Sequence, residues 1–319
     1  MSSSTGIELG ENSVAAIFDG QGTQWEGMGK DVHKRYKVAR DVFKIASEAC
    51  GVDMRRACFG NNPYLLDDTR IAQPAIVTVG LAKYRAWLES NSEPAVVTGL
   101  SMGLYPAVGV SAITGRNGRR DTKSVDFETV NTVFERAKIM QAVAVDKNGR
   151  MVPVIGPHRE DIESAIKGTG AKIGVFLDKT VHTLTGQEHA VEIAATKVSG
   201  LKARILDALP IHQAAHHELQ ADTVEPLMDL LEKSSIRNPI IRIAANGPFY
   251  LTSRQEIIEH LLQQMTEPAD WQAAEEMLLL GGIRKVVQFG ADRRQSLAFQ
   301  MAKNGKDLGV QVITFPETA

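Results

Sequence analysis

Cysteine, aromatic residues, net charge and long apolar runs are all scarce in this sequence of 319 residues. The two cysteines, Cys50 and Cys58, do not have C-x-x-C spacing, which argues against a metal site or a disulfide framework. A net charge of −2 provides no general attraction to nucleic acid or to a membrane surface. The first residues lack the basic flank and apolar core of a secretory signal, and no apolar stretch is long enough to cross a bilayer. We therefore expect a cytoplasmic protein whose partners include neither nucleic acid nor a membrane.

The most informative feature that is present is the pentapeptide G-L-S-M-G at residues 99–103. It follows a β-branched run at residues 93–98, which is typical of a buried strand, and it leads into an apolar segment able to start a helix. A serine between glycines at a strand-to-helix turn is a nucleophile elbow, in which the serine oxygen stands clear of the sheet. The free N–H groups of the new helix then point at a reacting carbonyl. The pattern predicts attack on an acyl group by Ser101.

A simpler interpretation of the same pentapeptide is a glycine-rich turn with Ser101 as the N-cap of a helix. The preceding strand favours the nucleophile elbow, because structural context is what confirms this motif. Pro106 lacks the N–H that a regular helix uses, so we expect an irregular first turn after the serine.

The hydrophobic pattern along the chain alternates between short strands and amphipathic helices, which predicts an α/β fold. We expect strands at 14–18, 93–98, 285–289 and 310–314, and helices at 31–49, 73–88, 127–143, 223–233, 255–264 and 271–280. Between them, strands at 151–155, 172–177, 182–185 and 202–206 alternate with helices at 159–167 and 188–199. Their β-α-β-β-α-β order is that of a ferredoxin-like unit. A polar, basic stretch at 115–124 is predicted to be a surface loop.

These patterns predict two parts of unequal size, for which 319 residues are sufficient. Residues 1–147 and 209–319 are expected to form a large α/β catalytic subdomain with a central, mostly parallel sheet. Residues 148–208 are expected to form a small ferredoxin-like subdomain inserted into it.

Five motifs follow one another along nearly the whole chain. Residues 18–24 read F-D-G-Q-G-T-Q, residues 72–75 read A-Q-P-A, Ser101 lies in the elbow, residues 136–141 read R-A-K-I-M-Q, and residues 209–216 read L-P-I-H-Q-A-A-H. Together they resemble the malonyl-CoA:acyl carrier protein transacylases, which include acyltransferases of fatty-acid and polyketide synthesis. The resemblance implies a hydrolase-like large subdomain. It also implies ping-pong transfer of a malonyl, or related carboxylated acyl, group from coenzyme A to the phosphopantetheine thiol of an acyl carrier protein through an acyl-serine.

The resemblance assigns a catalytic dyad to Ser101 and His216. A serine hydroxyl needs an adjacent base to become a nucleophile, and His216 occupies the place of the family's histidine. In the family a backbone carbonyl holds the other ring nitrogen, and the match assigns that carbonyl to Asp270. His212 and His217 compete for the role, although a histidine is more often a surface or partly buried polar residue. The spacing within residues 209–216 selects His216.

The resemblance also assigns the groups that bind the substrate. Gln21 and Met102 are expected to supply the backbone N–H groups of the oxyanion hole. Arg136 is expected to bind the malonyl carboxylate through two hydrogen bonds, with Gln73 supporting the pocket beside it. The simpler interpretations are a loop residue for Gln21, a helix-start residue for Gln73, and an exposed arginine or a structural ion pair for Arg136. We expect no metal and no cofactor, since the coenzyme A thioester is a substrate.

Some positions depart from the family's pattern. Asp19 stands in place of a proline, and Leu104 in place of a glutamate. Residues 213–216 read Q-A-A-H, which matches neither the malonyl-selective nor the methylmalonyl-selective pattern. The small side chain of Ala215 should widen the acyl pocket. The sequence leaves open the preferred acyl group, the pathway, the carrier protein and the oligomeric state.

Two other functions stay open at this point. One is an acyl hydrolase of the same fold, which would use water in place of the carrier thiol, and the other is a catalytically inactive module that docks a carrier protein. Arg136 favours transfer, because hydrolase relatives typically lack this arginine. Arg116, Arg119 and Arg120 of the basic stretch are candidates for docking an acidic carrier protein, since opposite charges raise encounter rates.

Overall fold

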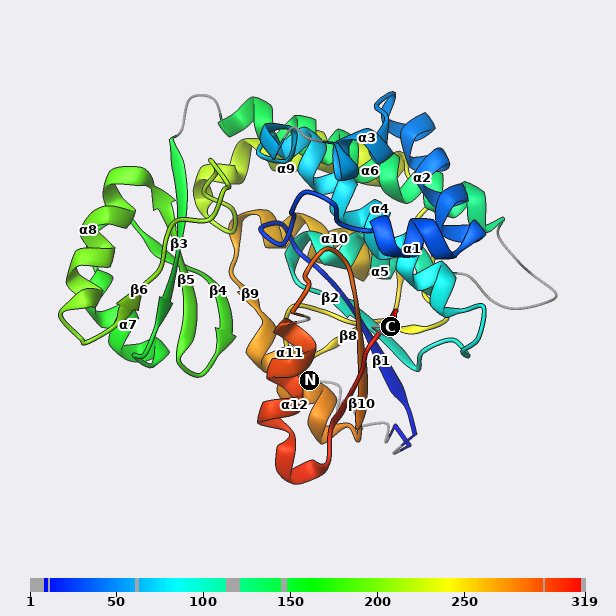
Figure 1. Ribbon diagram of the computed structural model, residues 1–319. Helices are drawn as coiled ribbons and strands as arrows, with labels where there is room; N and C mark the ends of the chain where they lie inside the picture. The colour runs from blue at the N-terminus through cyan, green and yellow to red at the C-terminus, as the bar shows by residue number, and fades with distance from the viewer. Residues whose placement is uncertain are drawn as a thin grey trace.

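The structure is a computed structural model of the chain, and it describes residues 9–10, 12–60, 63–112, 121–144, 148–294 and 296–316. Arg116, Arg119 and Arg120 of the basic stretch lie outside the described residues. Two sheets of different size organise the part that is described (Figure 1). Within that part no helix combines the length and the apolar character that crossing a membrane requires.

The larger sheet has six strands, of which five run parallel and the last runs antiparallel. In spatial order they are β11 (Gln311–Ile313), β10 (Lys285–Phe289), β1 (Val14–Phe18), β2 (Val96–Gly99), β7 (Arg242–Ala244) and β8 (Tyr250–Leu251). Successive side chains of β1 are buried on opposite faces, with Ala16 and Phe18 in one hydrophobic cluster and Ala15 and Ile17 in another. Burial on both faces is what a parallel sheet between two layers of helices requires.

Helices cover both faces of this sheet (Figure 1). The face that carries Phe18 is covered by α1 (Lys30–Arg35), α2 (Lys37–Cys50), α3 (Met54–Phe59), α4 (Thr69–Trp87), α5 (Leu104–Ser111), α6 (Thr122–Ala144), α9 (Val224–Lys233) and α10 (Arg254–Thr266). The opposite face is covered by α11 (Trp271–Leu280) and α12 (Ser296–Asn304). Short 3-10 turns are η1 (Pro63–Leu66), η2 (Ser101–Gly103), η3 (Glu218–Thr223) and η4 (Lys306–Leu308).

The smaller sheet takes four antiparallel strands from one stretch of chain and a fifth strand from elsewhere. In spatial order they are β6 (Arg204–Ile205), β3 (Gly149–Ile155), β5 (Val181–Gln187), β4 (Lys172–Asp178) and β9 (Ala269–Asp270). α7 (Arg159–Ile166) and α8 (Glu188–Ser199) pack on one face of this sheet, as in a ferredoxin-like unit. β9 runs parallel to β4 and joins the inserted sheet to the chain that follows α10.

The predicted α/β fold, with a mostly parallel sheet and a ferredoxin-like insert, is confirmed. Two strands and two helices have the bounds that the sequence predicts, namely β1, β10, α8 and α11. The division at residues 148 and 208 stays a prediction, and β9 adds to the inserted sheet a strand from outside that range.

Other predicted bounds are wrong. The single helix expected at 31–49 is two helices, because Tyr36 is extended (φ −115°, ψ 130°) and its ring packs 5.7 Å from the ring of Phe315. Residues 122–124, expected in the basic loop, form the first turn of α6. The sequence pattern also missed α12 and three shorter elements, α3, β7 and β8, which have too few residues to show a clear period.

Candidate active site

Ser101 lies at the turn between β2 and α5, in a left-handed backbone conformation with φ 54°. The two flanking glycines are required for this turn. A Cβ atom on Gly103 would lie 2.3 Å from the carbonyl oxygen of Phe18, and one on Gly99 would lie 2.2 Å from the carbonyl oxygen of Gly103. The turn is the 3-10 segment η2, so the expected irregularity after the serine is present. Pro106 falls in the first turn of α5, where its missing N–H has no intrahelical partner to lose.

Asn246 holds the elbow from the neighbouring strand. It follows β7, which pairs with β2 in the sheet. Its Oδ1 accepts the N–H of Ser101 at 2.7 Å, and its Nδ2 donates to the carbonyl oxygen of Gly99 at 2.7 Å. No motif in the sequence points to Asn246, because only the order of strands in the folded sheet brings it beside the serine.

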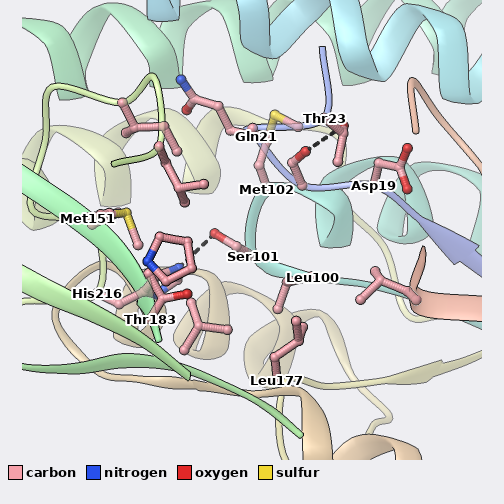
Figure 2. A pocket seen from close by; sticks show the side chains of 18 of the residues that line it. Asp19, Gln21, Thr23, Leu100, Ser101, Met102, Met151, Leu177, Thr183 and His216 are labelled. Atoms are coloured by element: carbon pink, nitrogen blue, oxygen red, sulfur yellow. Dashed lines mark hydrogen bonds between the residues drawn. The ribbon is translucent and has the colours of Figure 1, made fainter. Parts of the chain in front are cut away.

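His216 faces the serine (Figure 2). Its Nε2 lies 2.8 Å from the Oγ of Ser101, although 115 positions separate the two residues. Its Nδ1 lies 2.6 Å from the carbonyl oxygen of Gln264 and 3.3 Å from that of Glu267. A carbonyl oxygen can only accept, so Nδ1 carries the proton and Nε2 presents its lone pair to the serine hydroxyl.

The expected carbonyl partner, Asp270, is therefore wrong. Gln264 lies in the last turn of α10, where backbone carbonyls have no intrahelical N–H to accept, so a carbonyl there is free to bind the imidazole. The side chain of Asp270 caps α11 instead, where it accepts the N–H of Ala273 at 2.9 Å.

Burial keeps His216 neutral. Desolvation lowers the pKa of its imidazole from 6.5 to about 4, against the opposing effect of the two backbone carbonyls. At neutral pH the ring is thus an unprotonated base beside a hydroxyl, which is the state that can take a proton from serine.

The two competing histidines lie elsewhere. His212 is exposed. His217 is half-buried at the start of η3, where its Nδ1 accepts the N–H of Leu219 at 3.2 Å and its Nε2 donates to the carbonyl oxygen of Gly170 at 3.1 Å. Neither lines the cavity described below.

Arg136, on α6, is almost completely buried, with 3% of its surface exposed. One guanidinium nitrogen donates to the Oε1 of Gln73 at 2.7 Å, and the guanidinium carbon lies 5.2 Å from the ring centre of Tyr105. No described residue forms a hydrogen bond with its Nε. Among the described residues no carboxylate pairs with Arg136, so the arrangement leaves a buried cation ready for an anion from outside the chain.

Gln73 and Gln21 connect Arg136 to the first loop. The Nε2 of Gln73 donates to the Oε1 of Gln21 at 2.9 Å, and the Nε2 of Gln21 donates to the Oγ1 of Thr69 at 3.1 Å. The side chain of Gln73 is therefore oriented with its oxygen toward the guanidinium.

A cavity of about 260 Å³ joins these groups. All six predicted site residues line it: Gln21, Gln73, Ser101, Met102, Arg136 and His216. Most of its remaining wall is apolar and includes Leu177 of the inserted sheet and Ala215. A low-polarity wall strengthens any charge interaction made inside it.

Asp19, which stands where the family has proline, is buried at the edge of the same cavity (Figure 2). Its Oδ2 accepts the N–H of Asp292 at 2.7 Å, and its Oδ1 accepts a hydrogen bond from Gln288 at 2.5 Å. Burial raises the pKa of this carboxyl to about 6. Asp19 thus connects the loop after β1 to the turn after β10 through a hydrogen bond that a proline could not make.

Comparison with known proteins gives the family to which the chain belongs. Residues 16–267 match the family described as acyl transferase domain. The chain belongs to this family.

This acyl transferase is 27% identical, over 285 residues, to the malonyl CoA-acyl carrier protein transacylase of Escherichia coli strain K12, which covers 86% of this chain and 88% of the relative. It matches the crystal structure of malonyl CoA-acyl carrier protein transacylase from Clostridium perfringens with a TM-score of 0.83 and 27% identity, over 94% of this chain and 92% of that one. A malonyl-transacylase in complex with its type II PKS acyl-carrier protein matches with a TM-score of 0.81 and 25% identity, over 89% and 91%.

Among the described residues no group of three or more His, Cys, Asp or Glu side chains is placed to hold a metal ion. Cys50 and Cys58 are both free and buried, and burial raises the pKa of each thiol.

Proposed function

We propose that this acyl transferase moves a malonyl, or related carboxylated acyl, group from coenzyme A to the phosphopantetheine thiol of an acyl carrier protein. The observation that carries the proposal is a serine–imidazole hydrogen bond of 2.8 Å in the same cavity as a buried arginine without a carboxylate partner among the described residues. Nucleophile, base and carboxylate-binding group are the three parts that this reaction needs. The transacylases to which the chain is similar support the assignment.

In the first half-reaction Ser101 Oγ attacks the thioester carbonyl while its proton passes to Nε2 of His216. The oxyanion formed is bound by the backbone N–H groups assigned to Gln21 and Met102, each worth about 3 kcal/mol of transition-state stabilisation. When the intermediate collapses, the carbon–sulfur bond breaks and the coenzyme A sulfur takes the proton from the imidazolium. The product is an ester on Ser101 and free coenzyme A thiol.

The second half-reaction repeats these steps with the carrier thiol. His216 Nε2 takes the thiol proton, the sulfur attacks the ester carbonyl, and the proton returns to the oxygen of Ser101 as the carbon–oxygen bond breaks. The Nδ1–H bond to the carbonyl oxygen of Gln264 keeps the ring in one tautomer through both halves. A third acidic residue is not needed for this, because the carbonyl fixes the orientation of the ring.

Arg136 selects the acyl group. A planar guanidinium binds a carboxylate through two parallel hydrogen bonds, and the guanidinium of Arg136 is already oriented by Gln73. A carboxylated acyl group supplies the anion that the buried cation lacks, whereas an acetyl group leaves it unpaired.

Intact-mass measurement after exposure to malonyl-CoA tests the proposal. We expect one malonyl adduct, absent in Ser101→Ala, with formation slowed about 10⁴-fold or more in His216→Ala. His212→Ala and His217→Ala are matched controls that should retain most of the rate, because neither ring lines the cavity. An equal loss in His217→Ala would contradict the assignment of the base.

The fate of the adduct separates transfer from hydrolysis. With a holo carrier protein present, we expect the malonyl group to appear on the carrier rather than as free malonate. Release of free acid at the same rate with and without the carrier would mean an acyl hydrolase. Failure of any thioester to label Ser101 would mean an inactive docking module.

A further inference from the structure

The turn that follows β10 is held rigidly beside the acyl cavity. Three successive backbone groups of this turn are bound by side chains from three different segments. The hydrogen bonds run from Lys83 Nζ to Gly290 O (2.7 Å), from Trp25 Nε1 to Ala291 O (2.5 Å), and from Asp292 N to Asp19 Oδ2 (2.7 Å). Asp19 is buried and Lys83 is half-buried. These bonds fix the backbone from which the next two side chains, Arg293 and Arg294, project.

Both arginines are exposed and available to a ligand. The guanidinium carbon of Arg293 lies 3.3 Å from the ring centre of Trp25. Stacking on an aromatic face orders a guanidinium while its N–H donors stay free at the edge. Arg294 Nε is 4.0 Å from Asp292 Oδ1, but the carboxylate of Asp292 is already occupied by the N–H groups of Arg294 and Ser296, each at 2.8 Å.

These arginines line a hollow that adjoins the acyl cavity. The hollow has a volume of about 450 Å³ and shares Gly22, Thr23 and Ser296 with the cavity that contains Ser101. A substrate arm that leaves the serine past these three residues enters the hollow. Glu26, which is exposed, is the other carboxylate among the described residues that line it, besides Asp292.

We propose that Arg293 and Arg294 bind the phosphate at the far end of the pantetheine arm. The proposal rests on the proposed function, since that function brings a pantetheine thioester to Ser101. Coenzyme A carries a diphosphate at this point of the arm, and a holo carrier protein carries a phosphodiester. Two guanidinium groups can bind either through charge-assisted, bidentate hydrogen bonds. The same two residues would thus hold the arm in both half-reactions.

Calorimetric titration with coenzyme A and with pantetheine, which lacks the phosphates, tests this without requiring any chemistry at Ser101. In the variant Arg293→Ala/Arg294→Ala we expect the Kd for coenzyme A to rise about 10- to 100-fold, as loss of hydrogen bonds to a charged group implies. The Kd for pantetheine should stay unchanged. Equal weakening of both ligands, or of neither, would overturn the proposal.

A matched control removes the same number of positive charges elsewhere. Arg204→Ala/Arg237→Ala changes two exposed arginines, neither of which lines the hollow or the acyl cavity. We expect this variant to bind coenzyme A as the unmodified protein does. An equal rise in Kd would show that overall charge, rather than the turn after β10, attracts coenzyme A.

A second measurement uses the holo carrier protein as the substrate. The KM for a holo carrier protein should rise in Arg293→Ala/Arg294→Ala together with the Kd for coenzyme A. A rise for the carrier alone would overturn the proposal, because it would mean contact with the carrier's protein surface. Failure of malonyl-CoA to label Ser101 would refute the proposed function, whereas the titrations still decide the role of the two arginines.

Discussion

Two buried arginines lie on the same pair of packed helices, α4 and α6, and they differ in whether a carboxylate pairs with them. At one place Arg85 of α4 makes three hydrogen bonds of 2.7–3.2 Å to the carboxylate of Asp126 on α6. At the other, Arg136 of α6 donates to the amide oxygen of Gln73 on α4, with the sulfur of Met265 at 3.8 Å and the ring of Tyr105 beside it. The charge of Arg85 is thus paired within the chain. Arg136, which lines the acyl cavity, has no carboxylate partner among the described residues.

The difference fits a structural role for Arg85 and the recognition role proposed for Arg136. A buried charge is costly unless it is paired, so a fold retains an unpaired one only where something compensates for it. At Arg136 an amide oxygen and an aromatic face partly stabilise the cation in the free protein. The remaining hydrogen-bonding capacity is then available to a carboxylate from the substrate.

Arg85→Ala should have the largest effect on stability. It leaves the buried carboxylate of Asp126 without its partner, and breaking such a pair costs about 3–5 kcal/mol of unfolding free energy. Urea denaturation measures this loss. Arg136→Ala should lose clearly less, since it leaves only a neutral amide behind. Equal losses of unfolding free energy in the two variants would contradict the view that only Arg85 is paired within the chain.

Arg136→Ala should instead have the largest effect on substrate choice. Loss of two charge-assisted hydrogen bonds is expected to lower kcat/KM for malonyl-CoA about 100-fold or more. Transfer from acetyl-CoA should rise, because the variant no longer leaves a buried cation unpaired under a neutral acyl group. A loss of malonyl transfer without any gain for uncharged acyl groups would contradict a role in recognition.

Gln73→Glu should give Arg136 a carboxylate partner within the chain, as Arg85 already has. The change is isosteric and places a carboxylate oxygen where the amide oxygen now lies, 2.7 Å from the guanidinium. The new internal partner competes with the substrate carboxylate, so we expect kcat/KM for malonyl-CoA to fall about tenfold, as loss of one hydrogen bond to a charged group implies. Steady-state kinetics with acetyl-CoA provides the control, because transfer of an acyl group without a carboxylate should not fall when the cation is paired within the chain. Unchanged malonyl transfer would show that the substrate carboxylate binds elsewhere.

Malonyl-CoA and acetyl-CoA should differ least in how their kcat/KM depends on pH. Acidification removes the base only as the pH approaches the lowered pKa of His216, about 4, well below the ordinary 6.5. The same imidazole serves both substrates. In the pH profiles of kcat/KM, the fall on the acid side should therefore occur at the same pH for malonyl-CoA and acetyl-CoA, well below pH 6.5. A fall at different pH values would mean that a second titrating group takes part in binding the carboxylate.

The local features of the fold could be predicted from the sequence. The strand β1 and the helix α8 follow from the hydrophobic period, and Gly99 follows from the close approach of Gly103, so all three involve only residues that are near in the chain. The break at Tyr36 could not, because it depends on contact with a ring near the other end of the chain.

In the candidate site, too, some residues follow from sequence motifs and others depend on the folded arrangement. The motifs identified Ser101, His216 and Arg136, and the structure brings them to one cavity. Neither Asn246 nor the carbonyl of Gln264 could be identified, since the first depends on strand order and the second on where α10 ends. The roles of Gln21 and Met102 in binding an oxyanion stay predictions. So does the cytoplasmic location.

The fifth strand of the inserted sheet has a mechanical consequence. β9 begins only two residues after Glu267, whose carbonyl contacts His216, and it is hydrogen-bonded along β4. The inserted sheet, which supplies part of the cavity wall, is therefore connected through a few residues of extended chain to a carbonyl that contacts His216. We expect a tilt of this sheet that admits a bulkier thioester to move that carbonyl relative to the imidazole as well.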